Sequence, residues 1–536
     1  MTVEEVEDAL RKMKHKKTGA EDGLVAEMLK TGHRGLLVAL SLLLDDILSG
    51  RAQTPETWRR IKMKVIFKKG DPHMPKNYRP ISILPVMAKL YSTVIYQRLQ
   101  PILDAQLADE QFGFRKGRGC SDAIHILRQV IEKSAEWGEQ LWVATLDVEK
   151  AFDRVHHSCL FEALLCGEVD VCIVSALRRL YFGMQATVLV EGGGESRYFD
   201  VQRGVRQGDP LSPLLFNFVL HQTLQEVNTI WKRRGYGTNV GLTLGGHRLT
   251  HVAFADDMTL ISRSRLSMKR MLESLRVALS DRGLSLHPSK CKLQTNDMSL
   301  EDRGSTLISD GFVVEFLERD RNLELLGTSL SLADVTGQEI EHRIASAWRM
   351  FWGMKPLLLN QRASIRRRLR LFDATVGSCV TWCCESWSPR ATELRQLESA
   401  RRAMLRKIVG ARRALEEEWL DWIKRATHKA LSWASRTGVR DWSRWHHQRK
   451  WAWAGHVARS PANTWLYRVS TWRDSDWQAF NADSGTLRLL RPSTRRWMRW
   501  EDTLRRFCAT WQQLAQDREA WAARSPDFLA HVRLTE

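Results

Sequence analysis

The alternation of apolar and polar residues divides the chain into four parts. Residues 1–60 show the periodicity of helices, whereas residues 61–330 alternate between short apolar runs, typical of strands, and longer amphipathic stretches. Residues 341–410 and 411–536 have helical periodicity again. The pattern therefore predicts an α+β central part with helical regions on either side of it.

One apolar stretch near the middle of the chain is interrupted by two adjacent carboxylates. From His251 to Ile261 the flanks are rich in Val, Phe, Leu and Ile, which predicts a hairpin with Asp256 and Asp257 between its strands. Because neighbouring side chains on a straight strand point to opposite faces, the two aspartates converge only at a tight turn. Two anions in an apolar setting are costly unless a cation compensates them. The stretch therefore predicts a site for a hard divalent cation such as Mg²⁺.

A third carboxylate follows another apolar run. Leu141–Leu146 predicts a strand, and Asp147 stands at its end, before a helix-like segment. Together with the hairpin aspartates it would hold two Mg²⁺ ions about 4 Å apart, which is the arrangement of metal-dependent phosphoryl transfer. The alternative is structural: Asp147 caps the next helix, and Asp256 and Asp257 form a polar turn.

Further motifs occur around these aspartates in a fixed order. They are Lys68-Lys69-Gly70-Asp71, Asn77-Tyr78-Arg79-Pro80-Ile81-Ser82, Gln111-Phe112-Gly113-Phe114-Arg115, Asp147-x-x-x-x-Phe152-Asp153, Gly204-Val205-Arg206-Gln207-Gly208-Asp209-Pro210, Phe254-Ala255-Asp256-Asp257 and Gly283-Leu284-Ser285-Leu286-His287-Pro288-Ser289-Lys290. This ordered series resembles the reverse transcriptases of LINE-type, non-LTR retrotransposons. The resemblance covers roughly residues 1–400.

The resemblance implies a right-hand polymerase fold. Residues 1–60 would be an N-terminal helical extension, and residues 61–330 the fingers and palm, with the three aspartates on an antiparallel sheet that has helices on one face. Residues 341–410 would form a helical thumb that grips the primer and template. The resemblance explains residues 411–536, a basic helical region rich in Trp and Arg, poorly.

The implied activity is that of an RNA-directed DNA polymerase, which extends a DNA primer on an RNA template with deoxynucleoside triphosphates. Asp147, Asp256 and Asp257 would bind two Mg²⁺ ions, with Mn²⁺ as an alternative. Lys290 matches a family lysine near the leaving pyrophosphate, a candidate general acid. His287 stands where family members often carry Asn, which leaves Lys292 as a competitor.

The resemblance also implies a nucleotide-binding pocket. Lys68, Lys69 and Arg79 are candidates for binding the triphosphate, since Arg grips phosphate with two hydrogen bonds and Lys acts as a point charge. Only one of the two lysines is expected to do so, and the pattern leaves open which one. Pro80 favours an extended backbone at Arg79, which helps to aim its side chain.

Three further residues are assigned to the pocket by resemblance. Phe152 stands where the family has its steric gate, at which a bulky ring crowds a ribose 2′-hydroxyl; the alternative is a core aromatic residue. Gln207 and Gly208 would line the pocket for the nucleotide and template, because a glycine lets the backbone approach the incoming base.

Positive charge is concentrated in the last part of the chain. The net charge is +20, and residues 341–536 hold 37 Lys and Arg against 19 Asp and Glu, a net charge of +18. A polyanionic partner is expected for such a region, most simply the backbone of RNA or DNA.

Eighteen of the 22 Trp also fall in this region, and they support two interpretations. One series recurs at steps of three and four residues, which predicts the buried stripe of a single helix. A second group lies among Arg and His residues and is the better candidate for stacking on unpaired bases, with burial an equally weighted alternative. The first series is Trp497, Trp500, Leu504, Phe507, Trp511, Leu514 and Trp521, and the second group is Trp442, Trp445, Trp451 and Trp453.

Composition narrows the cellular setting. No apolar run approaches the ~20 residues that a membrane-spanning helix needs, and the first residues do not resemble a signal peptide. The nine cysteines are scattered, which predicts reduced thiols. We therefore expect an intracellular protein, nuclear after its synthesis in the cytoplasm, without a membrane partner.

Two other functions compete with this interpretation. A group II intron-type reverse transcriptase would share the aspartates, but no maturase or HNH-type Cys/His cluster is visible, and the Phe-Ala-Asp-Asp and Asn-Tyr-Arg-Pro motifs favour the LINE type. A catalytically silent RNA-binding protein would keep the basic helices, but the intact aspartate set argues against it.

Overall fold

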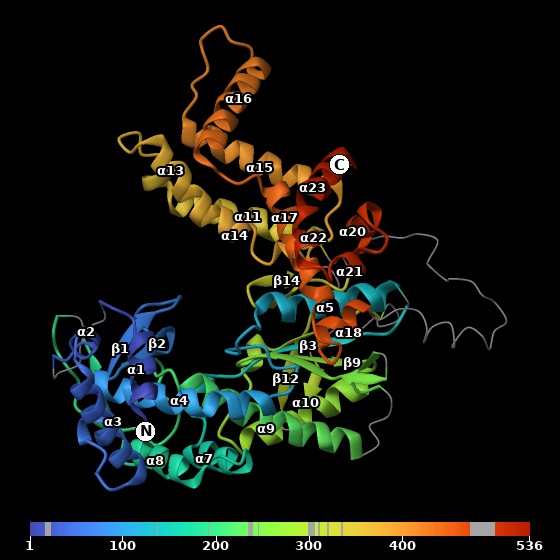
Figure 1. The fold of residues 1–536 in the computed structure, drawn as a ribbon. Coiled ribbons are helices and arrows are strands. Elements are labelled where there is room, and N and C mark those ends of the chain that lie inside the picture. The colour runs from blue at the N-terminus through green and yellow to red at the C-terminus, as the bar shows by residue number, and fades with distance from the viewer. Residues whose placement is uncertain are drawn as a thin grey trace.

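The computed structural model contains a six-stranded sheet, a four-stranded sheet, helices packed against both, and a helical C-terminal region (Figure 1). The residues that it describes are 1–16, 23–136, 138–190, 192–233, 239–244, 246–297, 306–308, 311–318, 321–333, 336–471 and 499–535.

The six-stranded sheet is mostly antiparallel. Its strands are β3 (Trp142–Asp147), β8 (His251–Phe254), β9 (Asp257–Ser262), β10 (Lys292–Thr295), β11 (Thr306–Ile308) and β12 (Phe312–Phe316). Their order in the sheet is β11-β12-β10-β3-β9-β8, and only β10 and β12 pair in parallel. The α+β class is therefore confirmed, and β3, which ends in Asp147, has a strand on either side.

Helices cover both faces of this sheet, not one face as predicted. Trp142 and Leu146 of β3 belong to a core with helices α4, α9 and α10, whereas Val143 packs in a second core with helix α5. Figure 1 shows α5 on one side of the sheet and α9 and α10 on the other. The physical reason is that Trp142–Leu146 are all buried, and a strand that is apolar on both faces needs cover on both. The bounds are Val86–Gln106 for α4, Cys120–Glu136 for α5, Ser212–Arg233 for α9 and Arg265–Ser280 for α10.

The four-stranded sheet packs beside the N-terminal helices. Its strands are β1 (Arg60–Phe67), β2 (Tyr78–Ile83), β4 (Gln185–Leu189) and β5 (Phe199–Asp200), in the order β2-β1-β4-β5. β1 pairs antiparallel with β2 and parallel with β4. Other elements of the central part are α6 (Ala151–Arg154), α7 (His157–Cys166), α8 (Val171–Tyr181), β6 (Leu242–Leu244), β7 (His247–Leu249), β13 (Leu323–Leu325) and β14 (Thr328–Leu330).

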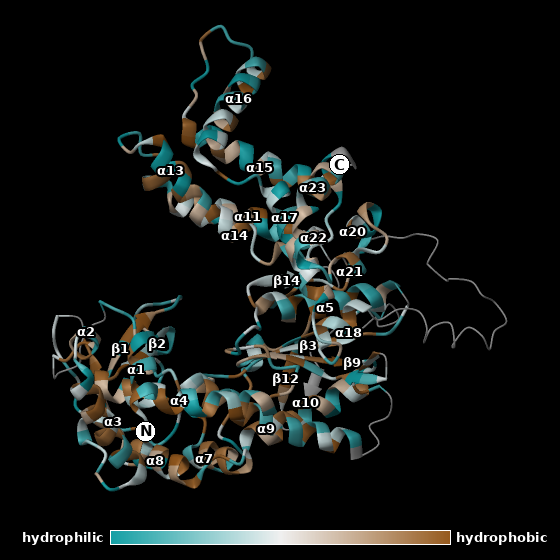
Figure 2. Cartoon of the chain, viewed as in Figure 1, coloured by the Kyte–Doolittle hydropathy of each residue, from teal (hydrophilic) through white to brown (hydrophobic). Residues whose placement is uncertain are grey.

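Residues 337–442 have a core of their own. It is built from α11 (Gly337–Gly353), α12 (Lys355–Leu358), α13 (Ile365–Phe372), α14 (Ser378–Val380), α15 (Ala391–Val409) and α16 (Trp419–Thr437). α15 and α16 pack against each other, so the helices on either side of residue 410 belong to one packed unit. α13 is amphipathic: Leu369 and Phe372 are buried, while Arg366, Arg367 and Arg370 are exposed. Figure 2 shows both hydrophobic and hydrophilic stretches along this helix.

The last helices pack against α5 of the central part. They are α17 (Trp442–Ala458), α18 (Trp465–Thr471), α20 (Asp502–Phe507), α21 (Trp511–Leu514), α22 (Arg518–Ala523) and α23 (Ser525–Thr535). Their Trp side chains share the second core with Ile126 and Leu127 of α5. Trp451 and Trp521 stack with ring centroids 3.6 Å apart, and the indole N–H of each donates to the backbone carbonyl of the other at 3.0 Å.

The predicted tryptophan stripe is buried, but it does not lie on one helix. Trp500, Trp511 and Trp521 are at most 4 % exposed, yet they belong to separate short segments. The helical turn stops at Cys508, which has an extended backbone, and a new turn starts at Asp517, whose side chain caps α22. These breaks let the rings converge on α5. Trp497, the first residue of the predicted stripe, lies outside the described residues.

The base-stacking interpretation is wrong for two residues of the second group. Trp442 and Trp451 are buried in cores and cannot stack on a nucleic acid. Trp445 and Trp453 are half-buried. Trp453 packs edge-on to His125 of α5 at 5.9 Å, which is again a contact between helices.

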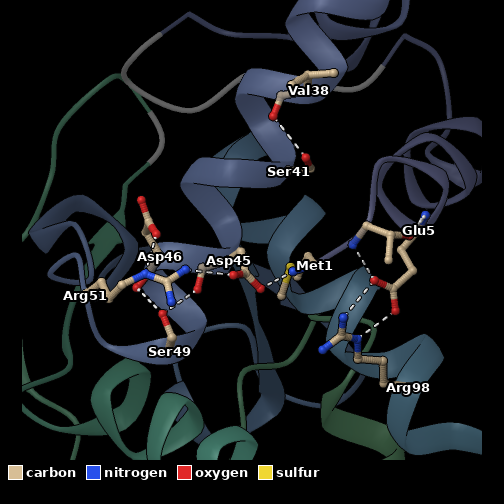
Figure 3. Close-up of polar contacts among 10 residues, drawn as sticks. Met1, Glu5, Val38, Ser41, Asp45, Asp46, Ser49, Arg51 and Arg98 are labelled. Carbon is tan, nitrogen blue, oxygen red and sulfur yellow. Dashed lines mark hydrogen bonds and ion pairs between the residues drawn. The ribbon is translucent and has the colours of Figure 1, made fainter.

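One ion pair joins the N-terminal helices to the central part, and others lie within residues 1–60 (Figure 3). Glu5 of α1 (Val3–Lys12) accepts two hydrogen bonds of 2.7 Å from Arg98 of α4. The terminal ammonium of Met1 pairs with Asp45 of α3 (Arg34–Ser49), and Asp45 also binds Arg51. α2 (Ala26–Lys30) completes this group of helices.

Candidate active site

The acidic hairpin forms as the sequence predicts. β8 and β9 are antiparallel, and Phe254 pairs with Asp257, which leaves Ala255 and Asp256 as a two-residue turn. Ala255 has a φ of +56°. This left-handed backbone costs a residue with a Cβ roughly 1–2 kcal/mol, so the surrounding structure must hold the turn in place. Asp256 then lies at the tip, and Asp257 begins β9.

Asp147 lies next to this turn. In the pairing of β3 with β9, Asp147 is the register partner of Asp257, so the ends of the two strands coincide. Burial raises the pKa of Asp256, and the Asp147 carboxylate raises it further. Burial raises the pKa of Asp257 to about 6, with added repulsion from Asp256 and Asp147. The structure thus brings the three predicted carboxylates to one end of the sheet, where they repel one another.

Lys290, rather than Lys292, lies at this site. Its ammonium donates to both carboxylate oxygens of Asp147, at 3.0 and 2.6 Å. The backbone N–H of His287 donates to the Asp147 carbonyl at 2.8 Å, which holds the short 3₁₀ helix Pro288–Lys290 against the end of β3. Lys292 instead pairs with Glu315 on the neighbouring strand. His287 therefore supports the register of Lys290 with its backbone.

The cationic residues differ in their relation to the aspartates. Burial lowers the pKa of Lys68, nearby Arg79 and Lys290 lower it further, and Asp147 and Asp256 act in the opposite direction. Lys68 and Arg79 therefore share the electrostatic environment of the acidic site. Lys68 and Lys69 are both exposed, and neither makes a hydrogen bond or ion pair with these aspartates among the described residues. Of the two lysines, the structure favours Lys68 as the one that faces the site.

Phe152 contacts two other aromatic rings and is only partly buried. It is half-buried in α6, and its ring stacks on Phe216 of α9 with centroids 4.7 Å apart and planes 26° apart. The ring of Phe114 meets it edge-on, at 6.1 Å and 81°. One part of the ring thus packs in the core while another part stays accessible.

Gln207 and Gly208 join the loop before α9 to β2. The Gln207 carbonyl accepts a hydrogen bond of 2.7 Å from the Ser82 N–H, and its side chain donates to Asp153 at 2.6 Å. Gly208 has a φ of +116°, and a Cβ there would lie 2.8 Å from the Ser82 carbonyl oxygen. The close approach that Gly208 permits is therefore to the backbone of β2.

A cavity of about 490 Å³ lies between this loop and the four-stranded sheet. Met63, Ser82, Asp153, Met184 and Gln207 are among the residues that line it. The cavity opens beside the loop that carries Gln207, which was assigned to the nucleotide and template pocket on the sequence alone.

Sequence reasoning assigned no function to Gln111-Phe112-Gly113-Phe114. In the structure this segment contacts the acidic turn, since the Phe112 N–H donates to the Ala253 carbonyl at 2.8 Å. The signal was present, because the segment is one of the motifs shared with the family. Its spacing alone did not indicate what it touches.

Comparison with known proteins identifies the domain that carries the site. Residues 66–330, which contain all of the candidate site residues, match the family model "Reverse transcriptase (RNA-dependent DNA polymerase)". Residues 66–330 form a reverse transcriptase domain. Among curated relatives, the Pol polyprotein of the type-1 retrotransposable element R2 of Popillia japonica is 29% identical over 287 residues, which cover 54% of this chain and 38% of that protein.

Two further relatives extend the comparison. The Pol polyprotein of the element R2DM of Drosophila melanogaster is 30% identical over 44% of this chain and 21% of its own length. The RNA-directed DNA polymerase from mobile element jockey of Drosophila funebris is 23% identical over 77% of this chain and 44% of its own length. The chain thus spans less than half the length of these relatives. Among solved structures, apo telomerase from Candida tropicalis matches with a TM-score of 0.38 and 12% identity, over 86% of this chain and 77% of that one.

The described residues contain neither a membrane-spanning helix nor a ready-formed cluster of metal-binding side chains. None of the helices within them is long and apolar enough to cross a membrane. Nor do three or more of their His, Cys, Asp or Glu side chains already lie in the arrangement of a metal site. At the acidic turn, Asp147 is engaged by Lys290.

Proposed function

We propose that this chain is an RNA-directed DNA polymerase of the non-LTR retrotransposon type, which extends the 3′-hydroxyl of a DNA primer on an RNA template. The observation that carries the proposal is the meeting of Asp147, Asp256, Asp257 and Lys290 at one end of the six-stranded sheet, inside the reverse transcriptase domain. The curated relatives come from non-LTR elements, which favours this type over the group II intron type.

The carboxylates fit the chemistry of a divalent cation. Reverse transcriptases as a family depend on divalent metal ions, and hard carboxylate oxygens that raise one another's pKa are suitable ligands for them. We propose Mg²⁺ as the ion, two per site, with Mn²⁺ as the alternative, bound by Asp147, Asp256 and Asp257. When bound, the metal supplies charge stabilisation and makes the primer hydroxyl a better nucleophile.

The cationic residues would bind and orient the triphosphate. Arg79 lies on β2 with an exposed side chain, and its guanidinium suits a bidentate contact with phosphate oxygens. Lys68 would add a second positive charge from the loop after β1. Together they would align the α-phosphate with the primer end. This alignment reduces the loss of entropy on the way to the transition state.

Lys290 would supply the proton for the leaving pyrophosphate. Its ammonium lies 2.6 Å from Asp147, so a proton donor stands beside the proposed reacting centre. Phe152 would exclude a ribose 2′-hydroxyl with the accessible part of its ring. Gln207 would keep the loop before α9 against β2 through its bonds to Ser82 and Asp153.

The basic helical region would bind the primer and template. Arg366, Arg367 and Arg370 are exposed on α13, whose Leu369 and Phe372 pack in the core. Exposed arginines on one helix suit contacts with phosphates, which predicts binding that weakens as salt rises.

Primer extension on a defined RNA template tests the proposal. Purified protein with Mg²⁺ and deoxynucleotides should extend an annealed DNA primer to the end of the template. A catalytically silent RNA-binding protein would bind the same duplex without extension. The two results distinguish the proposed enzyme from this alternative in one experiment.

A further inference from the structure

A short segment runs beside the acidic turn and is bonded to it along its length. The Phe112 N–H donates to the Ala253 carbonyl at 2.8 Å, and the Ala253 N–H donates to the Glu110 carbonyl at 2.8 Å. These bonds form a parallel bridge between Gln111 and Ala253, outside the named strands. The segment Gln111–Phe114 is therefore an extra edge on the hairpin that carries Asp256 and Asp257.

Two side-chain features fix the segment at the turn itself. The buried Gln111 amide oxygen accepts hydrogen bonds from the Ala255 N–H, at 3.2 Å, and from the Gly113 N–H, at 3.3 Å. A Cβ on Gly113 would lie 2.4 Å from the Ala255 backbone nitrogen, so only glycine permits this approach. Asn217 of α9 holds the other side of Gly113 by donating to its carbonyl at 2.5 Å.

Phe114 follows directly and projects from this fixed segment. Its φ is +56°, which is a strained conformation for a bulky residue. Its ring is 57 % exposed, so burial does not repay that strain. Arg115 fixes the following backbone by donating to the carbonyls of Ala108, at 2.7 Å, and Gln111, at 3.1 Å. Strain that folding does not need is typical of functional sites.

The ring of Phe114 contacts the ring of Phe152. Their centroids are 6.1 Å apart and their planes are at 81°, which is the edge-to-face geometry of a favourable aromatic pair. Phe152 is also stacked on Phe216, whose side chain is completely buried. Phe152 is therefore supported by an immobile ring in the core and by an exposed ring on the segment beside the acidic turn.

We propose that Phe114 is a second residue that determines sugar selectivity, because its ring holds Phe152 in the orientation that excludes a 2′-hydroxyl. This inference rests on the proposed function, in which Phe152 is the steric gate. Phe216 restrains the Phe152 ring by stacking on it, and Phe114 restrains it by an edge-to-face contact. Without Phe114 the Phe152 ring gains freedom to tilt and admits ribonucleotides. Phe114 acts through Phe152, so it is a positioning residue.

The test compares deoxynucleotide and ribonucleotide insertion by four variants on one RNA template. Phe114→Ala should reduce the preference for deoxynucleotides about 3- to 10-fold, the effect expected for losing one aromatic pair. Phe114→Tyr keeps the ring and should retain the wild-type preference. Phe152→Val should reduce the preference more than Phe114→Ala does. The double variant Phe114→Ala/Phe152→Val should match Phe152→Val alone, since both residues act on one gate.

A binding measurement separates this inference from the proposed function. Affinities for a deoxynucleotide and the matching ribonucleotide are measured on a complex whose primer lacks a 3′-hydroxyl, so no chemistry is required. If the wild type binds with a sugar preference that Phe114→Ala reduces, but does not extend a normal primer, the proposed polymerase activity is wrong while the inference is supported. An unchanged sugar preference in folded Phe114→Ala, in binding and in insertion, would overturn the inference.

Discussion

Trp500 offers the clearest test of how the C-terminal helices are joined to the reverse transcriptase domain. Its side chain is 2 % exposed and packs edge-on against His125 of α5, with ring centroids 4.6 Å apart. Its indole N–H donates to the Glu385 carbonyl at 2.7 Å, and its backbone N–H donates to Glu132 of α5 at 2.8 Å. Three parts of the chain therefore meet at this one residue.

The variant Trp500→Ala would remove most of these contacts. Truncating a buried Trp to Ala costs about 3–5 kcal/mol, from lost burial and from the cavity that remains. The loss also leaves the Glu385 carbonyl without its indole donor, which places the expected effect in the upper half of that range. The backbone bond to Glu132 does not depend on the side chain and would persist.

Urea unfolding followed by far-UV circular dichroism measures this loss. Trp419→Ala is the matched control, because Trp419 is 55 % exposed at the start of α16 and its truncation should change stability by no more than about 0.5 kcal/mol. A second readout is RNA affinity, which a buried structural Trp does not change directly. A stable Trp500→Ala protein with weakened RNA binding would refute the packing argument and favour base stacking.

Two further predictions follow from particular residues. Burial raises the pKa of Glu132 to about 7 from an unfolded value near 4.5. Because the folded state binds this proton more tightly, its stabilising effect is complete below pH 4.5 and is lost as pH rises through 7; Glu132→Gln should flatten that part of a plot of Tm against pH, and an unchanged slope would contradict the assignment. Gly208→Ala should lower stability and primer extension together, by about 1–3 kcal/mol in unfolding free energy, because the new methyl group meets the Ser82 carbonyl. Gly192→Ala is its control, since Gly192 also has a positive φ but no atom within 4 Å of the added Cβ; equal losses in the two variants would show that only the backbone conformation matters.

The acidic hairpin was predictable because local pattern and register agree there. Apolar residues on both sides of Asp256 and Asp257 specify two strands, and a two-residue turn is the shortest way to connect them. Asp147 was predictable for a similar reason, since it ends an apolar run that is long enough for a buried strand. The family resemblance suggested Lys290 as a site residue, and the fold was needed to show its contact with Asp147 and to distinguish it from Lys292.

The docking of the C-terminal helices could not be read from the sequence. α5 buries Asp122, His125, Arg128 and Glu132, which a hydrophobicity pattern places on an exposed face. They are buried because distant residues supply their partners, such as the Trp500 N–H for Glu132 and the hydroxyl of Thr328 for Arg128. A local pattern records which side chains are polar but not which partners satisfy them after folding.

The prediction that helices cover only one face of the six-stranded sheet was wrong for a related reason. The run Leu141–Leu146 was read as a strand, but its apolar residues occupy both faces, which already indicates cover on both sides. The family resemblance suggested helices on one face, and that expectation took precedence over the pattern. A nucleic-acid role was considered for Trp442 and Trp451 because Arg and His residues surround them in the sequence, and that pattern does not show that both rings are buried.

The central claim is that Asp147, Asp256 and Asp257 form the catalytic centre of an RNA-directed DNA polymerase, and one measurement tests it most directly. Primer extension on an RNA template with Mg²⁺ is compared between the wild type and Asp256→Asn, which removes a charge and nearly preserves volume. The account predicts extension by the wild type and a loss of at least a hundredfold in the variant, with a Tm no lower than that of the wild type and unchanged RNA binding. Extension by a folded Asp256→Asn protein at the wild-type rate would contradict the claim.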